Sequence, residues 1–342
     1  MGRLSFLNRI VFYLNLIFSL ALLLACIVPY TNSASLAFFS LSVPALVLVN
    51  LLFTFYWLFN KKFLILLPIA VLVYGYVTLG SFVKLGDQVN TVEENTSLRI
   101  MSYNSLGFRG KEDDWKSKAG DSIVRFIDQE APDIICFQEF DRRKKSDFLK
   151  EYPYRFVDNV RWEHEGRVAQ AIYSKYKIIK TGVLEFPKTV NSAIYSDIAY
   201  GADTLRIYSL HLQSLHIRPS NLKWERSDRL LARLRKAFQK QQQQSEIVRQ
   251  HMASSPYRNI VAGDFNNNQF SSVYFNLKRD LKDTFLEKGS GYGATINFWR
   301  FPFRIDFILV DPSFEVVAHQ NYDIDLSDHE PIMASIKISS NK

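Results

Sequence analysis

The first 85 residues of the chain form an almost continuous hydrophobic sequence. They contain five basic residues and no Asp or Glu, and no charge of either sign falls between Arg9 and Lys61. A helix needs about 20 apolar residues to cross the roughly 30 Å hydrocarbon core of a bilayer. The apolar runs therefore predict three transmembrane helices, at about residues 10–30, 36–59 and 63–82.

Basic residues predict how these helices are oriented. Arg3 and Arg9 precede the first run, Lys61 and Lys62 separate the second from the third, and the segment between the first two runs is uncharged. Because basic loops stay in the cytoplasm, three crossings place everything after about residue 84 outside it. The first run could instead be a cleaved signal peptide, which would leave two helices and the same final topology. We therefore expect an integral inner- or plasma-membrane protein with an extracytoplasmic domain.

Polar residues are rare within the predicted spans. Asn15 and Asn50 lie inside them, where interhelical hydrogen bonds are their expected role. No Asp, Glu, Lys, Arg or His falls within a span, so the sequence gives no sign of an ion or proton path, and a transport function is disfavoured.

After a polar linker at residues 85–97, strand and helix patterns alternate to the end of the chain. Alternating or short buried apolar runs predict strands at 98–104, 133–139, 170–175, 204–212, 257–266, 304–310 and 331–338. Helical spacing predicts helices at 117–131 and at about 221–252. We expect a membrane anchor at residues 1–84 and one α/β domain at 98–342, long enough to form its own core.

Charge and cysteine content add little to this picture. The chain carries 42 basic and 34 acidic residues, but the residues after the anchor hold 37 basic ones, a net charge of only +3. Net charge alone therefore does not indicate nucleic-acid binding. The basic, glutamine-rich helix at 221–252 is typical of a solvated face, although an anionic membrane or substrate could also contact it. Two cysteines, Cys26 and Cys136, give no disulfide framework.

Polar residues recur where the predicted strands end, and they form six clusters that can meet at one edge of a sheet. The clusters are Asn104, Gln138-Glu139, His211, Asp264-Asn266, Asp306 and Asp328-His329. Each alone has a structural explanation, such as a turn or a solvated strand end. Asp306, however, lies in an apolar strand and needs a partner there. His329, the natural partner, follows 23 residues later, which suits a strand, a turn and the start of the next strand.

In their order, these motifs resemble the endonuclease/exonuclease/phosphatase superfamily of phosphoesterases. The matching segments are Asn104 after the first strand, "QE" at 138–139, "HL" at 211–212, "GDFN" at 263–266, "RIDFIL" at 304–309 and "SDHEPI" at 327–332. The resemblance covers about residues 98–338 and is specific because all six occur in order. It implies two packed, mixed β-sheets flanked by helices, a four-layer α/β sandwich, here preceded by three transmembrane helices.

The resemblance also implies a role for each motif. Glu139 would bind Mg²⁺ (or Mn²⁺), with Asn104 and Asp328 nearby. Asp264 would position or deprotonate the attacking water, and Asn266 would hold the phosphate. His211 and His329 would hydrogen-bond the phosphoryl oxygens or assist the leaving group, with Asp306 orienting His329.

The substrate is less well defined than the chemistry. Leu106 and His211 depart from the pattern of abasic-site enzymes, which disfavours a repair role. An extracytoplasmic anchor suits a phospholipid head group, another phosphate ester or scavenged nucleic acid. The aromatic segment 291–307, with Arg300 and Arg304, either forms a wall facing the substrate or packs around a strand. A non-catalytic, membrane-tethered module that binds a phosphate ligand is the alternative, but every expected polar position is filled.

Overall fold

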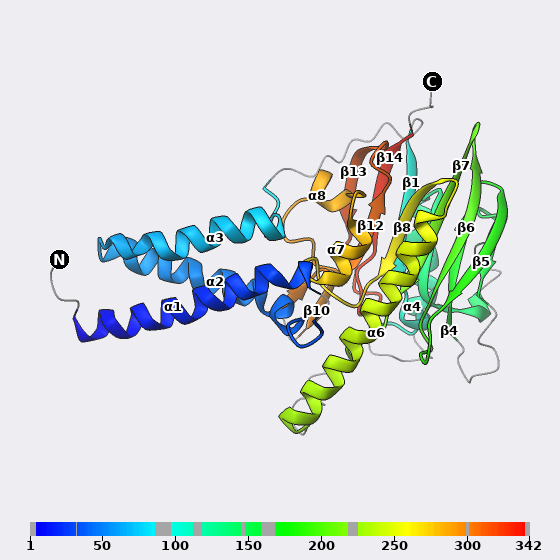
Figure 1. Ribbon diagram of the computed structural model, residues 1–342. Helices are drawn as coiled ribbons and strands as arrows, with labels where there is room; N and C mark the ends of the chain where they lie inside the picture. The colour runs from blue at the N-terminus through cyan, green and yellow to red at the C-terminus, as the bar shows by residue number, and fades with distance from the viewer. Residues whose placement is uncertain are drawn as a thin grey trace.

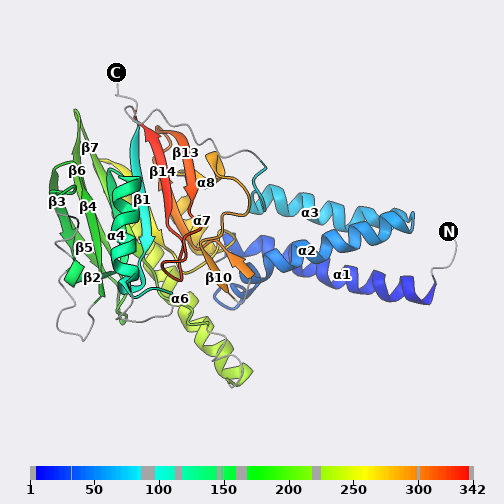
Figure 2. The ribbon, with the colours of Figure 1, turned by 180° about the vertical axis from the view of Figure 1, so that it is seen from behind.

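The computed structural model describes most of the chain. The described residues are 5–31, 33–85, 97–111, 118–144, 148, 150–158, 168–217, 225–298 and 301–338. The predicted linker lies largely outside them, at residues 86–96, as does Arg300. Figures 1 and 2 show a helical bundle at the N-terminal end, which projects from a layered α/β domain.

The N-terminal bundle contains the helices α1 (Phe6–Ile27), α2 (Phe38–Phe59) and α3 (Leu66–Leu79), packed side by side (Figures 1 and 2). Among the described residues, the two helical segments Phe6–Tyr30 and Phe38–Phe59 are long and apolar enough to cross a membrane. The prediction of three such helices is therefore corrected to two. The third run is helical but shorter, because it opens with a 3₁₀ turn and ends at Gly80, whose φ of +85° breaks the helix.

Hydrogen bonds between side chains hold α1 against α2. The Ser19 hydroxyl donates to Asn50 Oδ1 at 2.9 Å, and Trp57 Nε1 donates to Asn15 Oδ1 at 3.1 Å. Asn15 Nδ2 in turn donates to Ser19 Oγ at 3.1 Å. All four side chains are buried, so the interhelical role predicted for the two asparagines is confirmed.

Two mixed six-stranded sheets form the centre of the α/β domain. The first has the order β13-β14-β1-β2-β4-β3, and the second β5-β6-β7-β8-β12-β9. In each sheet one central pair is parallel, β1 with β2 and β7 with β8, and the other pairs are antiparallel. The strands of the first sheet are β1 (Leu98–Asn104), β2 (Ile134–Asp141), β3 (Tyr154–Val157), β4 (Val168–Ser174), β13 (Glu315–Asn321) and β14 (Ile332–Lys337). Those of the second are β5 (Ile178–Glu185), β6 (Ser192–Tyr200), β7 (Asp203–His211), β8 (Arg258–Asp264), β9 (Lys282–Asp283) and β12 (Asp306–Val310).

Helices cover the outer faces of both sheets. Ile123 and Ile127 of α4 (Ala119–Glu130) pack on the first sheet, and Val248 of α6 (Ser227–Ala253) and Val273 of α7 (Ser272–Lys278) pack on the second. A third apolar layer between the sheets combines residues such as Ile100, Ile134, Ile207 and Ile260. The predicted arrangement of two mixed sheets flanked by helices is thus confirmed. A short helix α8 (Thr284–Lys288) and a hairpin of β10 (Ile296–Phe298) and β11 (Phe301–Phe303) complete the domain.

The bundle and the domain share a packed interface. Phe270, between β8 and α7, is 1% exposed and belongs to the apolar core of the bundle, where its ring meets that of Phe82. Asn268 Nδ2 donates to the backbone oxygen of Ser40 at 2.8 Å. Phe38 of α2 meets Phe238 of α6 edge to face, with ring centroids 5.6 Å apart. The domain therefore rests directly on the helices and is not merely tethered to them.

The backbone at Gly263 in β8 requires glycine. Its φ is +146°, and a Cβ there would lie 2.2 Å from the Leu210 backbone oxygen on β7. We expect Gly263→Ala to destabilise the protein by at least about 3 kcal/mol and to lower the thermal midpoint in detergent by roughly 6–12 °C. Gly201→Ala is the control, because Gly201 also has a positive φ but nothing lies within 4 Å of its would-be Cβ. Equal shifts in the two variants would contradict the steric explanation.

Candidate active site

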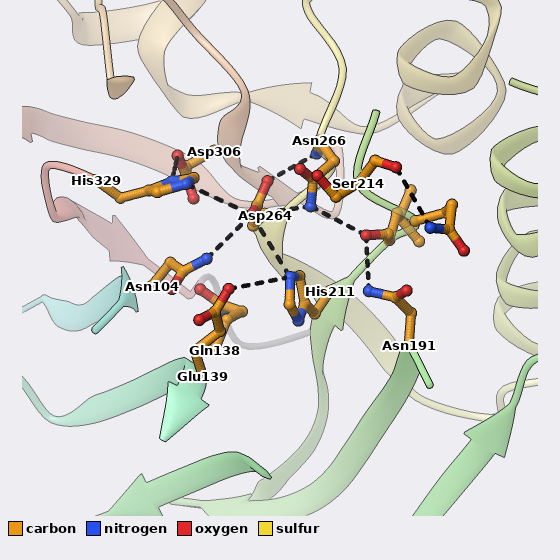
Figure 3. A network of polar contacts seen from close by, with 12 residues as sticks. Asn104, Gln138, Glu139, Asn191, His211, Ser214, Asp264, Asn266, Asp306 and His329 are labelled. Atoms are coloured by element: carbon orange, nitrogen blue, oxygen red, sulfur yellow. Dashed lines mark hydrogen bonds and ion pairs between the residues drawn. The ribbon is translucent and has the colours of Figure 1, made fainter. Parts of the chain in front are cut away.

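Strand register brings the predicted site residues together. In the second sheet, Asp264 at the end of β8 is paired with His211 on β7 and with Asp306 at the start of β12. In the first sheet, Asn104 on β1 is paired with Gln138 on β2. These side chains meet at one edge of the packed sheets (Figure 3). The predicted convergence of strand ends therefore arises from neighbouring strands within each sheet.

Asp264 is the centre of this cluster. Its carboxylate is 1% exposed and accepts hydrogen bonds from Asn104 Nδ2 at 3.1 Å, from the Asn266 backbone N–H at 2.7 Å and from Asn266 Nδ2 at 3.0 Å. The Nε2 atoms of His211 and His329 each lie 3.8 Å from Asp264 Oδ2 (Figure 3). Burial raises the pKa of Asp264 to about 6, although the two histidines oppose the shift. A carboxyl group that titrates near neutral pH is suited to accept a proton from water.

Asp306 and His329 form the pair that the sequence predicts. His329 Nδ1 lies 2.9 Å from Asp306 Oδ2, and both side chains are buried. With Nδ1 turned to the carboxylate, Nε2 faces Asp264. Burial by itself would lower the pKa of His329, but the charges of Asp306 and Asp264 outweigh it and raise that pKa well above its usual value. The ring thus holds its proton more tightly than an ordinary histidine does.

A β-bulge sets the direction of Glu139. The pairing of β2 with β4 shifts register between Phe137 and Phe140, and Glu139 has a φ of +50°. Its side chain is partly exposed and its Oε1 lies 3.8 Å from His211 Nε2. The bulge therefore turns a carboxylate from the first sheet toward residues of the second. Gln138, beneath it, is buried and joins the sheets by donating from Nε2 to Ser209 Oγ at 3.1 Å.

The donor groups suit a hard divalent cation. Asp264, Asp306 and His329 are all buried and offer three ligand atoms that lie within 4.8 Å of one another. Asp306 Oδ1 is buried and makes no hydrogen bond within the described part of the chain, so an oxygen ligand is free there. Carboxylate oxygens are what Mg²⁺ and Mn²⁺ prefer. The buried group can accordingly hold a metal ion.

The three residues predicted as metal ligands lie around this group in different settings. Glu139 faces the site, as described above. The amide of Asn104 is engaged, since its Oδ1 accepts the Leu106 N–H at 3.2 Å while its Nδ2 donates to Asp264. Asp328 is exposed and accepts from the Ser327 hydroxyl at 3.3 Å. The sequence pattern did not single out Asp264 and Asp306 as potential ligands.

Several supporting residues were not predicted. Ser327, inside the "SDHEPI" motif, donates to the Asn104 backbone oxygen at 2.8 Å and so ties the last loop to β1. The Thr295 hydroxyl accepts the N–H groups of Ile305 and Asp306, at 3.1 and 3.2 Å, and fixes the start of β12. The position of Ser327 next to Asp328 is a signal that could have found it, whereas Thr295 carries none.

Arg304 has a structural role. Its guanidinium is 2% exposed and donates to both oxygens of Asp283, at 3.0 and 2.8 Å. Of the two interpretations of segment 291–307, packing around a strand is the one that holds for Arg304.

Comparisons with known proteins agree with this geometry. The sequence profile of the Endonuclease/Exonuclease/phosphatase family matches residues 101–329, and that of a domain of unknown function (DUF8431) matches residues 8–82. Among curated proteins, none matches the chain.

Solved structures share the fold at low sequence identity. D. rerio TDP2 complexed with a single-strand DNA product is 16% identical, with a TM-score of 0.54, and the match covers 71% of this chain and 100% of that one. The human Nocturnin catalytic domain with bound sulfate is 19% identical, with a TM-score of 0.54 and coverage of 71% and 94%. The mannosyl-6-phosphatase Bt3783 of Bacteroides thetaiotaomicron is 18% identical, with a TM-score of 0.52 and coverage of 71% and 100%.

The raised pKa of His329 predicts a pH-dependent stability in EDTA. An unfolded histidine titrates near 6.5 and the folded one binds its proton more tightly, so this stabilisation is complete below pH 6.5. It is lost as pH rises through the folded pKa. We expect the thermal midpoint of the wild type to fall above pH 6.5, and to fall less in His329→Gln. His319→Gln should keep the wild-type slope, because the pKa of His319 is lowered to about 4 by burial and it stays neutral in this range. Identical slopes in all three proteins would contradict the assignment.

Proposed function

The chain belongs to the endonuclease/exonuclease/phosphatase family and is one of its phosphoesterases, and from this premise we propose that it is a membrane-anchored, divalent-metal-dependent hydrolase of phosphate esters. The observation that carries the proposal is the convergence of Glu139, His211, Asp264 and the Asp306–His329 pair from two sheets. Carboxylates for a cation, a near-neutral base and two imidazoles are what hydrolysis of a phosphate ester by water requires.

Two donor sets are candidates for the cation, Mg²⁺ or Mn²⁺. One is Glu139 with Asn104 and Asp328 at the rim, and the other is the buried group of Asp264, Asp306 and His329. The bound cation would act as a Lewis acid that stabilises negative charge on the phosphoryl oxygens. We favour Glu139 as the principal ligand, since His329 Nδ1 is already bonded to Asp306 and its Nε2 is needed as a donor.

The remaining residues have roles that follow from their contacts. Asp264, whose pKa is raised to about 6, would orient the attacking water and accept its proton. Asn266, held beside it by two hydrogen bonds, would contact the phosphate. His329, protonated because of Asp306, and His211 would donate to phosphoryl oxygens or to the leaving group. Attack by water is direct, so no covalent intermediate is needed.

The N-terminal bundle would be the membrane anchor. We assign it residues 1–84, with a linker at 85–97 and the catalytic domain at 98–342. The start of α1 and the turn between α2 and α3 lie at the end of the bundle farthest from the sheets (Figure 1). Arg9, in the first turn of α1, and Lys61 and Lys62, in that turn between helices, are exposed. Basic residues mark the cytoplasmic end. The helix α3 runs from that end back along α1 and α2 to the catalytic domain, which is consistent with our proposal that this domain lies outside the cytoplasm.

Variants of the full-length protein in detergent test the catalytic proposal. With Mg²⁺ and a chromogenic phosphodiester, we expect His329→Ala to lower kcat by about a thousandfold or more, because an essential donor is removed. Glu139→Gln should both lower kcat and raise the Mg²⁺ concentration needed for half-maximal rate, and EDTA should abolish the wild-type rate. Glu185→Gln on the edge strand β5 is the control and should match the wild type. A folded wild type that binds Mg²⁺ but turns over no ester would indicate a phosphate-binding module instead.

Cysteine labelling of intact cells tests the orientation. Native Cys26 and Cys136 are buried, whereas Leu85 is 93% exposed next to the domain and Lys62 is exposed at the far end of the bundle. A membrane-impermeant maleimide should label Leu85→Cys and should label Lys62→Cys only after the cells are lysed. The reverse pattern would place the catalytic domain in the cytoplasm.

A further inference from the structure

A cavity of about 230 Å³ lies between the N-terminal bundle and the active site. Four parts of the chain, far apart in sequence, line it: Leu41 of α2, the segment 214–217 after β7, the segment 266–268 after β8, and the β10–β11 hairpin with Ile305. The domain supplies most of the lining, and the bundle contributes to it through Leu41.

The lining contains both polar and apolar residues. Asn266 and Ser214 are among the polar ones, and Asn266 also donates to Asp264, so the cavity and the active site share this residue. Ile305 precedes Asp306 directly, and it too lines the cavity. The apolar lining comprises Leu41, Leu215, Ile217, Ile296, Phe298 and Phe303. A ligand in this cavity would have a hydrocarbon part beside a group held next to Asp264.

The bundle contributes Leu41 to the apolar lining. Leu41 lies on α2, one of the two helices long enough to cross a membrane, and its neighbour Ser40 accepts the hydrogen bond from Asn268. This contact fixes α2 at the cavity wall. Leu41 therefore gives a helix that is long and apolar enough to cross a membrane a direct place in the cavity lining.

Basic residues are gathered near the same junction. Leu234 and Phe238 of α6 pack against Ala34 and Ala37 just before α2, which places this part of α6 beside the bundle. Exposed basic side chains on that part are Arg229, Arg235 and Lys236. Positive charge beside a bilayer attracts anionic head groups.

From these observations, we infer that the substrate is an amphipathic phosphate ester drawn from the bilayer, whose hydrocarbon chain occupies the cavity while its phosphate reaches Asp264 and His329. This inference rests on the proposed phosphoesterase function and narrows its substrate to lipid-like esters. Hydrolysis adds water across the ester P–O bond, giving a phosphate and an alcohol, and needs no further reactant.

The test compares two chromogenic diesters that differ only in the alkyl group, p-nitrophenyl dodecyl phosphate and p-nitrophenyl methyl phosphate. The full chain in lipid nanodiscs is assayed with Mg²⁺, and the quantity measured is the ratio of kcat/KM for the dodecyl ester to that for the methyl ester. Each buried CH₂ contributes roughly fourfold in affinity. Leu41→Trp fills the cavity and should lower the ratio about fifteenfold, the loss of roughly two buried methylenes.

Leu48→Trp is the matched control, since Leu48 lies on the same helix, is 59% exposed and does not line the cavity. It should leave the ratio unchanged, which separates the cavity from any general effect of partitioning into the nanodisc. Ile217→Trp fills the cavity from the domain side and should act like Leu41→Trp. A ratio cannot be altered by a loss of folded protein alone, so poor folding of one variant does not obscure the result.

Other outcomes would overturn the inference. Equal ratios in Leu41→Trp, Leu48→Trp and the wild type would mean that no hydrocarbon chain uses the cavity. A kcat/KM for a single-stranded oligonucleotide far above that for either diester would identify a nucleic-acid substrate. Metal-dependent hydrolysis of the methyl ester without any use of the dodecyl ester refutes the lipid substrate alone, whereas no hydrolysis of any ester refutes the proposed function as well.

Discussion

Burial of one carboxylate, that of Asp264, is the constraint on which the site depends. A charged or polar group removed from water needs compensating partners, and Asp264 obtains them from Asn104 in the first sheet, Asn266 in its own loop and His329 before the last strand. These partners come from segments that meet only when both sheets are packed. The glycine before it allows β8 to lie against Leu210 closely enough to keep the register with β7. Catalytic geometry and the packing of the two sheets are therefore one arrangement.

The pattern of apolar residues along the chain predicted those helices and strands that depend mainly on local sequence. Seven strands and the helices α4 and α6 lie where apolar alternation and helical spacing placed them. Strand β6 was not predicted from the sequence, because Asp197 interrupts its apolar run. That carboxylate is tolerated only because Arg206, on the neighbouring strand β7, donates to both of its oxygens, at 2.6 and 2.8 Å. A partner supplied by another strand leaves no trace in the local sequence. The length of α3 was misjudged for a different reason, since its apolar run continues past Gly80, where the helix ends.

For the site, too, some features could be predicted from the local sequence and others could not. The pairing of Asp306 with His329 followed from the cost of a lone buried carboxylate and from the length of chain between them. The central place of Asp264 did not follow, because it depends on register between β7, β8 and β12. Nor did the positive φ of Glu139, since a bulge is a property of the pair of strands and not of one segment.

The hydrogen bond from Asn268 to Ser40 spans 228 residues of sequence. The helix that receives it is made early in synthesis, whereas the loop that gives it, and the neighbouring Phe270, are made late. Until then the aromatic ring of Phe270 is missing from the apolar core of the bundle, and the surface that this ring covers stays exposed. Contacts of such long sequence separation form slowly. Biogenesis of this protein thus has a built-in order, in which the helices of the N-terminal bundle reach their final packing only after the α/β domain has folded.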